Sequence, residues 1–250
     1  MIKTVLIFLF LSTFMVLLIP PVIILGFFYL IGMRKSMKLI IYRLAQGWAR
    51  SIIKMTGCSI TVSGRENISR KTGICFVSNH CGFFDIVLLI AYCGRPFGFI
   101  AKKELLLIPF LNLWIYLLGG LFIDRSNVRK AVRTINIGIQ RIKSGGGMLI
   151  FPEGHRSKGR GLLPFHPGSL KLATSAGAPI VPVAITGSYE VFERTYRVVS
   201  SPVKISFLKP IDTANLPSTD RKHILCDRIY SIIKEELGES SVEHIVNNEE

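Results

Sequence analysis

The sequence predicts an α/β protein with a mixed, largely parallel sheet flanked by helices, preceded by a membrane-binding segment of two helices, one hydrophobic and one amphipathic. Two observations predict this class. From about residue 56, short apolar runs alternate with stretches of helical periodicity. Ahead of them lie a long uncharged apolar run and a basic amphipathic one. We therefore divide the chain into membrane-anchoring helices at 1–55, an α/β domain at 56–237 and a polar tail at 238–250.

The apolar run at residues 4–32 carries no charge. As a helix it would extend about 43 Å, more than the bilayer's hydrocarbon core of about 30 Å. Pro20 and Pro21 interrupt the run, which predicts a kinked or broken helix whose halves are each too short for a full crossing. The run is too long for a cleaved signal peptide, so we expect it to be retained. The sequence leaves open whether it spans the bilayer or dips into one side of it.

The next stretch, residues 33–55, has six basic side chains and no acidic one. Its apolar residues recur at mostly helical spacing and include Trp48. Such a helix suits the headgroup region of an anionic leaflet. The alternative is a helix of the soluble core with solvated cations. Positive charge directly after an apolar segment also predicts that the following domain lies on the cytoplasmic side.

The net charge of +15 implies an anionic partner, either nucleic acid or an anionic membrane surface. The cations lie beside the membrane segment and form no nucleic-acid-binding pattern, so we expect the membrane surface and no nucleic acid. The five cysteines have no metal-ligand spacing, which predicts reduced thiols and no metal site. The chain has no glycine-rich nucleotide-binding loop, which gives a nucleotide cofactor no support.

The elements of the domain follow from the apolar pattern. We expect strands at 59–64, 74–77, 97–101, 121–123, 148–151, 180–185 and 203–208. We expect helical stretches ending near 92 and at 102–105, 127–143, 169–175 and 219–237. Pro182 lies inside a predicted strand, where it removes a ladder hydrogen bond, so we expect that strand at a sheet edge or bulge.

Polar side chains gather at the ends of three predicted strands. His80 follows the strand at 74–77, and Asp85 comes five positions later in the first turn of a helix, a spacing that suits an oriented general base. Arg125 follows the strand at 121–123, where its guanidinium could bind a phosphate or pair with Asp124. The buried strand at 148–151 is followed by a tight turn that carries a carboxylate, a glycine and a guanidinium: Glu153, Gly154 and Arg156.

These stretches resemble the four ordered motifs of the glycerolipid acyltransferases. The likeness runs from about residue 74 to about residue 210, and its motifs are Asn79–His80 with Asp85, then 120–125, 151–157 and 181–185. Four motifs in order with comparable spacing are a specific signal. The family's third motif usually reads Phe-Pro-Glu-Gly-Thr-Arg-Ser, whereas this chain has His155 in place of the Thr. This substitution affects the identity of the expected acceptor and leaves the expected reaction class unchanged.

The resemblance implies that the α/β domain transfers a fatty acyl group from acyl carrier protein or acyl-CoA to the sn-2 hydroxyl of 1-acyl-sn-glycerol 3-phosphate, giving phosphatidic acid. The alternative acceptors are glycerol 3-phosphate, another lysophospholipid and a lyso-ornithine lipid. The amphipathic N-terminal helices also fit the bacterial members, which implies the cytoplasmic face of the bacterial inner membrane. Carried over by position, the residues implied are the base His80, its orienting partner Asp85, and for substrate binding Lys102, Arg125, Glu153, Gly154 and Arg156.

Elementary chemistry agrees with this interpretation. A positioned base accelerates attack by a hydroxyl about 10²–10⁴-fold, and a thioester is already activated, so no cofactor is expected. The tetrahedral oxyanion needs donors, for which N–H groups near Gly82 and Gly154 are the candidates. We do not expect Cys81 to act as a nucleophile with His80, because neighbouring side chains diverge in a strand or turn. The apolar stretch 105–118 could line a groove for the acyl chain, dip toward the bilayer or form a packed pair of core helices.

Two other classes of function fit the sequence less well. A binding module without activity is permitted by the charge alone, but the charge does not explain the ordered motifs. A thioester or lipid hydrolase would need a nucleophile, and the chain has no G-x-S-x-G elbow.

Overall fold

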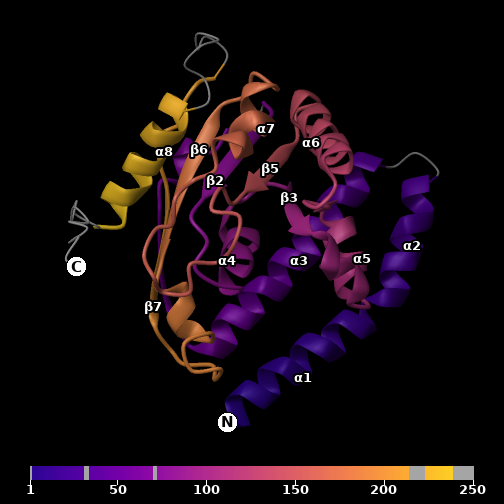
Figure 1. Cartoon of the computed structure of the whole chain (residues 1–250). Helices are drawn as coiled ribbons and strands as arrows, with labels where there is room; N and C mark the ends of the chain where they lie inside the picture. Colours follow the sequence, from indigo (N-terminus) through magenta and orange to yellow (C-terminus); the bar gives the residue numbers. More distant parts are fainter. Residues whose placement is uncertain (1, 31–33, 70–71, 214–222, 239–250) are drawn as a thin grey trace.

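The computed structural model describes residues 2–30, 34–69, 72–213 and 223–238, which form one seven-stranded sheet covered by helices on both faces (Figure 1). The spatial order of the strands is β1-β7-β6-β2-β5-β3-β4. Their bounds are β1 Ser59–Ser63, β2 Ile74–Ser78, β3 Phe97–Lys102, β4 Leu121–Ile123, β5 Gly147–Ile150, β6 Ile180–Thr186 and β7 Pro202–Phe207. Only β6 and β7 pair antiparallel within this described sheet, which confirms the predicted mixed, largely parallel class.

The helices agree with the predicted stretches to within a few residues. The α-helices of the domain are α4 Phe84–Tyr92, α5 Leu111–Leu117, α6 Val128–Lys143, α7 Lys171–Thr174 and α8 His223–Glu236. Three short 3₁₀ helices matter below: η2 Lys103–Leu107, η3 Pro167–Leu170 and η4 Ser188–Val191. Part of the predicted helix at 219–237, residues 219–222, and nearly all of the predicted tail at 238–250 lie outside the described residues.

Side chains alternate between two hydrophobic layers along the central strand β2. Phe76 faces the core formed with α3 and α4, whereas Cys75 and Val77 face the core formed with α6, α7 and α8. All five residues of β2 are buried, as expected of a parallel strand covered on both faces. The carboxyl ends of the parallel strands β2, β3, β4 and β5 consequently open at one edge of the sheet, where polar residues can gather.

The N-terminal segment forms three helices: α1 Ile2–Leu17, α2 Ile19–Leu30 and α3 Arg34–Thr56. The break at Leu18, just ahead of Pro20 and Pro21, confirms the predicted broken helix. Among the described helices, the stretch Ile2–Pro21, which runs through this break, is long and apolar enough to cross a membrane by length and composition, contrary to the expectation that neither part of the run is long enough. In Figure 1, α1 runs diagonally below α3, and α2 continues beside α5.

The helix α3 belongs to the core of the domain. Its apolar side packs against α4 and the sheet and includes Tyr42, Ala45, Ala49, Ile52 and Ile53. Four of its cations are exposed on the other side: Lys38, Arg43, Arg50 and Lys54. Of the two alternatives for this stretch, a core helix with solvated cations accounts for most of its apolar side chains. Leu39 and Ile40 are the exception, because each is about two-fifths exposed.

The strand with Pro182 does not lie at a sheet edge, because β6 lies inside the sheet between β7 and β2, but the predicted bulge is present. The amide of Leu208 donates to the carbonyl of Pro182 over 2.9 Å, so the missing N–H of Pro182 also faces β7. The register between β6 and β7 ends at the pair Val183–Phe207, and pairing resumes at the bridge Ile180–Ile211 with one extra residue on the side of Ile211. Pro182 therefore lies at a one-residue irregularity of the ladder, which tolerates its missing N–H.

The packing of β3 against the loop before β4 gives a test of the fold. A Cβ at Gly98 would lie 2.1 Å from the backbone oxygen of Gly119, so Gly98→Ala should lower the free energy of unfolding by about 2 kcal/mol or more. The control is Gly47→Ala on the exposed face of α3, where an added Cβ meets nothing within 4 Å. This control should stabilise by about 0.5–1 kcal/mol. Thermal unfolding in detergent followed by circular dichroism measures both, and equal melting temperatures would contradict the packing.

Candidate active site

The turn that follows β2 is anchored by Asn79. The Asn79 side chain accepts from the amide of Ile185 over 2.8 Å and donates to the carbonyl of the same residue over 2.9 Å. This amide group thereby extends the pairing of β2 with β6 by one step beyond the last backbone pair, Ser78–Val183. His80, the next residue, therefore has a fixed position at the end of the sheet.

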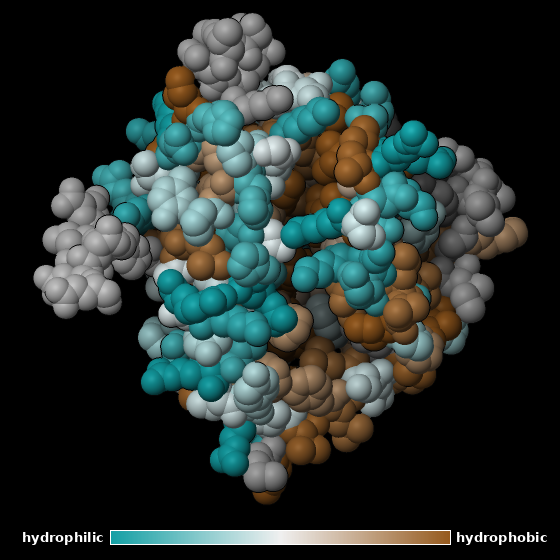
Figure 2. All heavy atoms as spheres, viewed as in Figure 1, coloured by the Kyte–Doolittle hydropathy of each residue, from teal (hydrophilic) through white to brown (hydrophobic). Residues whose placement is uncertain are grey.

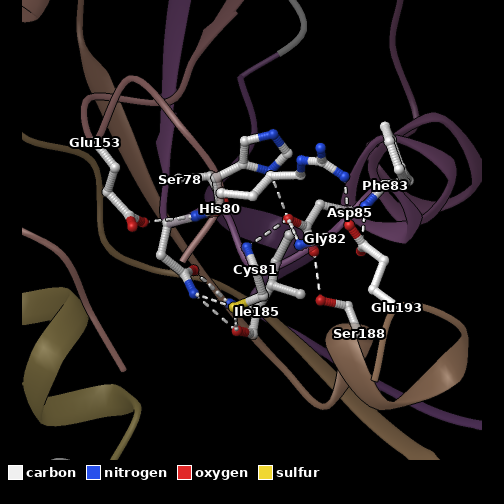
Figure 3. Close-up of polar contacts among 12 residues, drawn as sticks. Ser78, His80, Cys81, Gly82, Phe83, Asp85, Glu153, Ile185, Ser188 and Glu193 are labelled. Atoms are coloured by element: carbon white, nitrogen blue, oxygen red, sulfur yellow. Dashed lines mark hydrogen bonds and ion pairs between the residues drawn. The ribbon is translucent and has the colours of Figure 1, made fainter. Parts of the chain in front are cut away.

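His80 and Asp85 form a close pair across the turn. The distance from His80 Nδ1 to Asp85 Oδ2 is 2.7 Å, and Asp85 is fully buried at the start of α4 (Figure 3). The same carboxylate accepts from the amides of Cys81 and Gly82 and, through Oδ1, from the hydroxyl of Ser188. These bonds suit a carboxylate anion, which accepts the Nδ1 proton of His80 and leaves Nε2 as the basic atom.

The motif after β5 holds His80 from the other side. The carboxylate of Glu153 accepts from the amides of His80, over 2.7 Å, and of Leu163, over 3.3 Å. The amide of Ser157 donates to the carbonyl of His80 over 2.7 Å. The imidazole also stacks on the ring of Phe151, with 3.9 Å between ring centroids. These contacts fix both the backbone and the ring of His80.

A third set of contacts joins the turn to the loop after β6. Glu193 accepts from the amide of Phe83 over 2.8 Å through one carboxylate oxygen and pairs with Arg156 through the other. The guanidinium of Arg156 lies over the ring of Phe83, 3.7 Å from its centroid, a cation–π geometry. Arg156 is therefore held beside the turn that carries His80.

Arg125 does not pair with Asp124, its neighbour in the sequence. Asp124 pairs with Lys103 over 2.8 Å, and this hydrogen-bonded cation lowers the pKa of Asp124 to about 2. Arg125 instead donates to the carbonyl of Gly154 over 2.9 Å. Gly154 has a φ of 76°, and a Cβ there would lie 2.8 Å from the Arg125 guanidinium, so the position favours glycine on both counts.

A cavity of about 1110 Å³ opens beside this cluster. Of the residues predicted from the sequence, it is lined by His80, Lys102, Arg125, Gly154 and Arg156. Its apolar wall comes from α3, α4, β3 and the apolar stretch 105–118, the last contributing Leu105, Leu111, Trp114, Ile115 and Leu118. Figure 2 shows the molecule hollowed near its centre, with hydrophilic side chains above and beside the hollow and hydrophobic ones below. Such a cavity combines an apolar compartment with a cationic rim.

Two expectations change in this geometry. Glu153 is 1% exposed and does not line the cavity, so its contacts favour a role in holding His80 rather than in binding the acceptor. Among the N–H groups near Gly82 and Gly154 considered as oxyanion donors, those of the two glycines already have acceptors: the Gly82 amide donates to Asp85 and the Gly154 amide to Phe151. The sequence did not reveal that these N–H groups form hydrogen bonds within the turns themselves.

The sequence interpretation also missed residues that the fold brings to the site. Ser188 and Glu193 come from the loop after β6 and carry no motif that would have singled them out. Lys158, Arg160 and His166 line the cavity from the loop between β5 and η3, together with His155. A simple signal existed for the two cations, because they continue the basic stretch that begins at Arg156.

Comparison with known proteins shows the family of the chain. The profile of the Acyltransferase family matches residues 59–186, which is more than half of the chain, and the chain belongs to this family. Three relatives are each named 1-acyl-sn-glycerol-3-phosphate acyltransferase. The chain is 33% identical to the protein of Borreliella burgdorferi over 55% of each chain. It is 37% identical to that of Saccharomyces cerevisiae over 65% of this chain and 54% of the yeast protein.

The third relative is the protein of Escherichia coli K12, 34% identical over 66% of each chain. The match therefore spans little more than half the length of the first two relatives and about two thirds of the third. The fold resembles the crystal structure of the 1-acyl-sn-glycerophosphate (LPA) acyltransferase PlsC from Thermotoga maritima. The TM-score is 0.79 at 23% identity, covering 96% of this chain and 97% of the other.

The state of Cys81 can be tested directly. Its thiol donates to the carbonyl of Ile185, and burial, followed by the charge of Asp85, raises its pKa to about 12. At pH 8 only about one molecule in 10⁴ should carry the thiolate, and this fraction should rise as the pH rises toward 12. Alkylation by iodoacetamide, followed by peptide mass spectrometry, should label Cys81 at least 100-fold more slowly in the folded protein than in guanidinium chloride at the same pH. Equal rates would show an accessible, reactive thiolate.

Proposed function

We propose that this protein transfers a fatty acyl group from the thioester of acyl carrier protein or acyl-CoA to the sn-2 hydroxyl of 1-acyl-sn-glycerol 3-phosphate, giving phosphatidic acid for phospholipid synthesis. The observation that carries the proposal is the pair of His80 and buried Asp85 beside a cavity with an apolar wall and a cationic rim. Family membership supports the reaction class, and the names of the relatives support the acceptor.

His80 acts as the base. Nε2 takes the proton of the acceptor hydroxyl, whose oxygen attacks the carbonyl carbon of the thioester. Asp85 orients the ring through Nδ1 and stabilises the imidazolium that forms. The tetrahedral intermediate collapses as the carbon–sulfur bond breaks, and the imidazolium returns its proton to the leaving thiolate. The products are the ester and the free thiol, with no covalent acyl-enzyme and no net change at His80.

The cations at the rim bind the acceptor's phosphate. Lys102, Arg125 and Arg156 line the cavity, and a guanidinium matches a phosphate with two parallel hydrogen bonds. Gly154 lets Arg125 approach the backbone closely, so it shapes the same site. Glu153 contributes by fixing His80 rather than by touching the phosphate. His155, exposed at the rim, stands where the acceptor headgroup would pass.

The acyl chains lie along the apolar wall of the cavity. An acyl chain of ordinary length needs an apolar enclosure, which Leu105, Trp114 and Ile115 offer in the cavity.

The protein works on the cytoplasmic face of the bacterial inner membrane. The exposed apolar residues of α1 and α2, among them Leu9, Leu17 and Phe27, favour a bilayer as the partner of these helices. An acceptor dissolved in that bilayer has a short path to the site.

The reaction is tested by purified protein in detergent, given radiolabelled acyl-CoA or acyl carrier protein and lysophosphatidate. His80→Ala should lower kcat about 10²–10⁴-fold, and Asp85→Asn should lower it to a similar extent with little change in KM. The control is Cys81→Ala, one residue from the base, which should stay within about twofold of the wild type. A His80→Ala variant as fast as the wild type would refute the assignment of the base.

The acceptor is tested by a panel containing lysophosphatidate, glycerol 3-phosphate, lysophosphatidylethanolamine and lyso-ornithine lipid, read by lipid mass spectrometry. Arg125→Ala should lower kcat/KM for lysophosphatidate about 10–100-fold, because a hydrogen-bonded charge contact of about 1.5–3 kcal/mol is lost. It should barely change any turnover of the lyso-ornithine lipid, which has no phosphate. Arg129→Ala, an exposed cation on α6 away from the cavity, is the control. A preference for an acceptor without phosphate in the wild type would contradict the proposal.

A further inference from the structure

The loop between β6 and β7, residues 187–201, contacts both the catalytic turn and the first helix of the chain. On one side, Ser188 and Glu193 reach the turn that carries His80 (Figure 3). On the other side, Phe192 and Val198 contact α1. The mechanism above uses neither group of contacts.

The contacts on the catalytic side are buried and bear directly on the dyad. Ser188 is 1% exposed, and its hydroxyl donates to Asp85 Oδ1, the carboxylate oxygen that does not face His80. Glu193 is 9% exposed and is shared between the amide of Phe83 and the guanidinium of Arg156. A buried carboxylate oxygen without its donor is costly, so Asp85 would turn toward another donor if Ser188 moved. That rotation of the carboxylate would misalign it with His80 Nδ1, whereas a displaced Glu193 would release Arg156.

The contacts on the other side seat α1 on the same loop. The rings of Phe192 and Phe8 lie 5.4 Å apart at their centroids, and the amide of Val198 donates to Thr4 Oγ1 over 2.9 Å. Phe192 immediately precedes Glu193 in the chain. The same helix continues to Phe14, which stacks on Trp48 and lines the cavity. One face of α1 therefore packs along the domain from this loop to the cavity.

Hydrogen bonds inside the loop connect its two sides. The amide of Glu193 donates to the carbonyl of Tyr189, and the amide of Val199 donates to the carbonyl of Val191. These two bonds hold residues 189–199 together, and this segment connects Ser188 to the residues that contact α1. A shift of Phe192 or Val198 is consequently passed to Ser188 and Glu193 through a short backbone path.

We propose that Ser188 and Glu193 are positioning residues for acyl transfer, and that the seating of α1 on their loop through Phe8 and Thr4 keeps them in place. The inference rests on the proposed function and adds that the helix assigned to the membrane also sets the rate of the reaction. Ser188 acts through Asp85 on the chemical step. Glu193 acts through Arg156 on the binding of the acceptor.

The two positioning residues differ in their kinetic signatures. Ser188→Ala should lower kcat about 10–100-fold and leave KM for both substrates within about twofold. Glu193→Gln keeps an acceptor for the Phe83 amide but loses the charge that holds Arg156, so KM for lysophosphatidate should rise at least fivefold with a smaller change in kcat. Rates are normalised to folded protein by thermal unfolding. A merely structural role would lower the folded fraction and leave kcat and KM per folded molecule unchanged, which would overturn this assignment.

The coupling to α1 is tested by a double-mutant cycle in the full chain. Phe8→Ala should lower kcat threefold to tenfold, whereas Leu9→Ala, an equally apolar truncation of the exposed face of α1, should change it less than 1.5-fold. In the Ser188→Ala background, Phe8→Ala should have almost no further effect, because both changes disturb one linkage. Thr4→Val should behave like Phe8→Ala.

The outcomes separate this inference from the proposed function. Wild-type protein that transfers acyl groups, together with a Phe8→Ala variant as fast as Leu9→Ala, would overturn the coupling and leave the activity established. Independent, multiplicative effects of Phe8→Ala and Ser188→Ala would also overturn it. Wild-type protein without transfer to any acceptor would refute the proposed function, and the inference with it.

Discussion

The carboxylate of Asp85 is the interaction on which the site depends. It is fully buried, and four groups donate to it: the imidazole of His80, the amides of Cys81 and Gly82, and the hydroxyl of Ser188. A buried anion is tolerated only when such donors replace its lost water. Meeting this requirement closes the turn after β2, fixes the first turn of α4 and binds the loop after β6. The orientation of the His80 imidazole therefore follows from supplying donors to one buried charge.

The topology of the sheet explains why charge and apolar surface meet at the cavity. Parallel strands deliver their carboxyl ends to one edge, so the segments after β2, β4 and β5 bring His80, Arg125 and Arg156 together. Helices α3, α4 and α5 cover the neighbouring face and contribute apolar side chains. An amphiphile with an anionic head and a long acyl chain matches both parts of this cavity. The proposed substrate thus has the polarity pattern of the site that would hold it.

The N-terminal helices and the domain are one packed unit rather than an anchor tied to an enzyme. Helix α3 shares its buried side with α4 and the sheet. Leu25 of α2 and Leu18 before it pack on the cluster formed by Ile41 of α3 and Trp114 of α5. Helix α1 keeps its other side exposed and apolar. In the proposed function, this exposed side faces lipid and the opposite side borders the cavity, so a bilayer substrate would reach the site without a large motion. The proposed coupling of α1 to Ser188 is consistent with this arrangement.

The sequence by itself determined the features that rest on local patterns. The alternation of apolar runs gave the α/β class, Pro20 and Pro21 gave the broken helix, and the short spacing of His80 and Asp85 gave the dyad, since one turn can bring them together. Tertiary structure decided every partner that lies far along the chain. Ser188 is 103 residues from Asp85 and Glu193 is 110 from Phe83, so no periodicity connects them. The interior place of Pro182 likewise depends on where β7 ends, and the partner of Asp124 on where η2 begins. Pairing between distant segments is set by packing of the whole sheet, which no local pattern encodes.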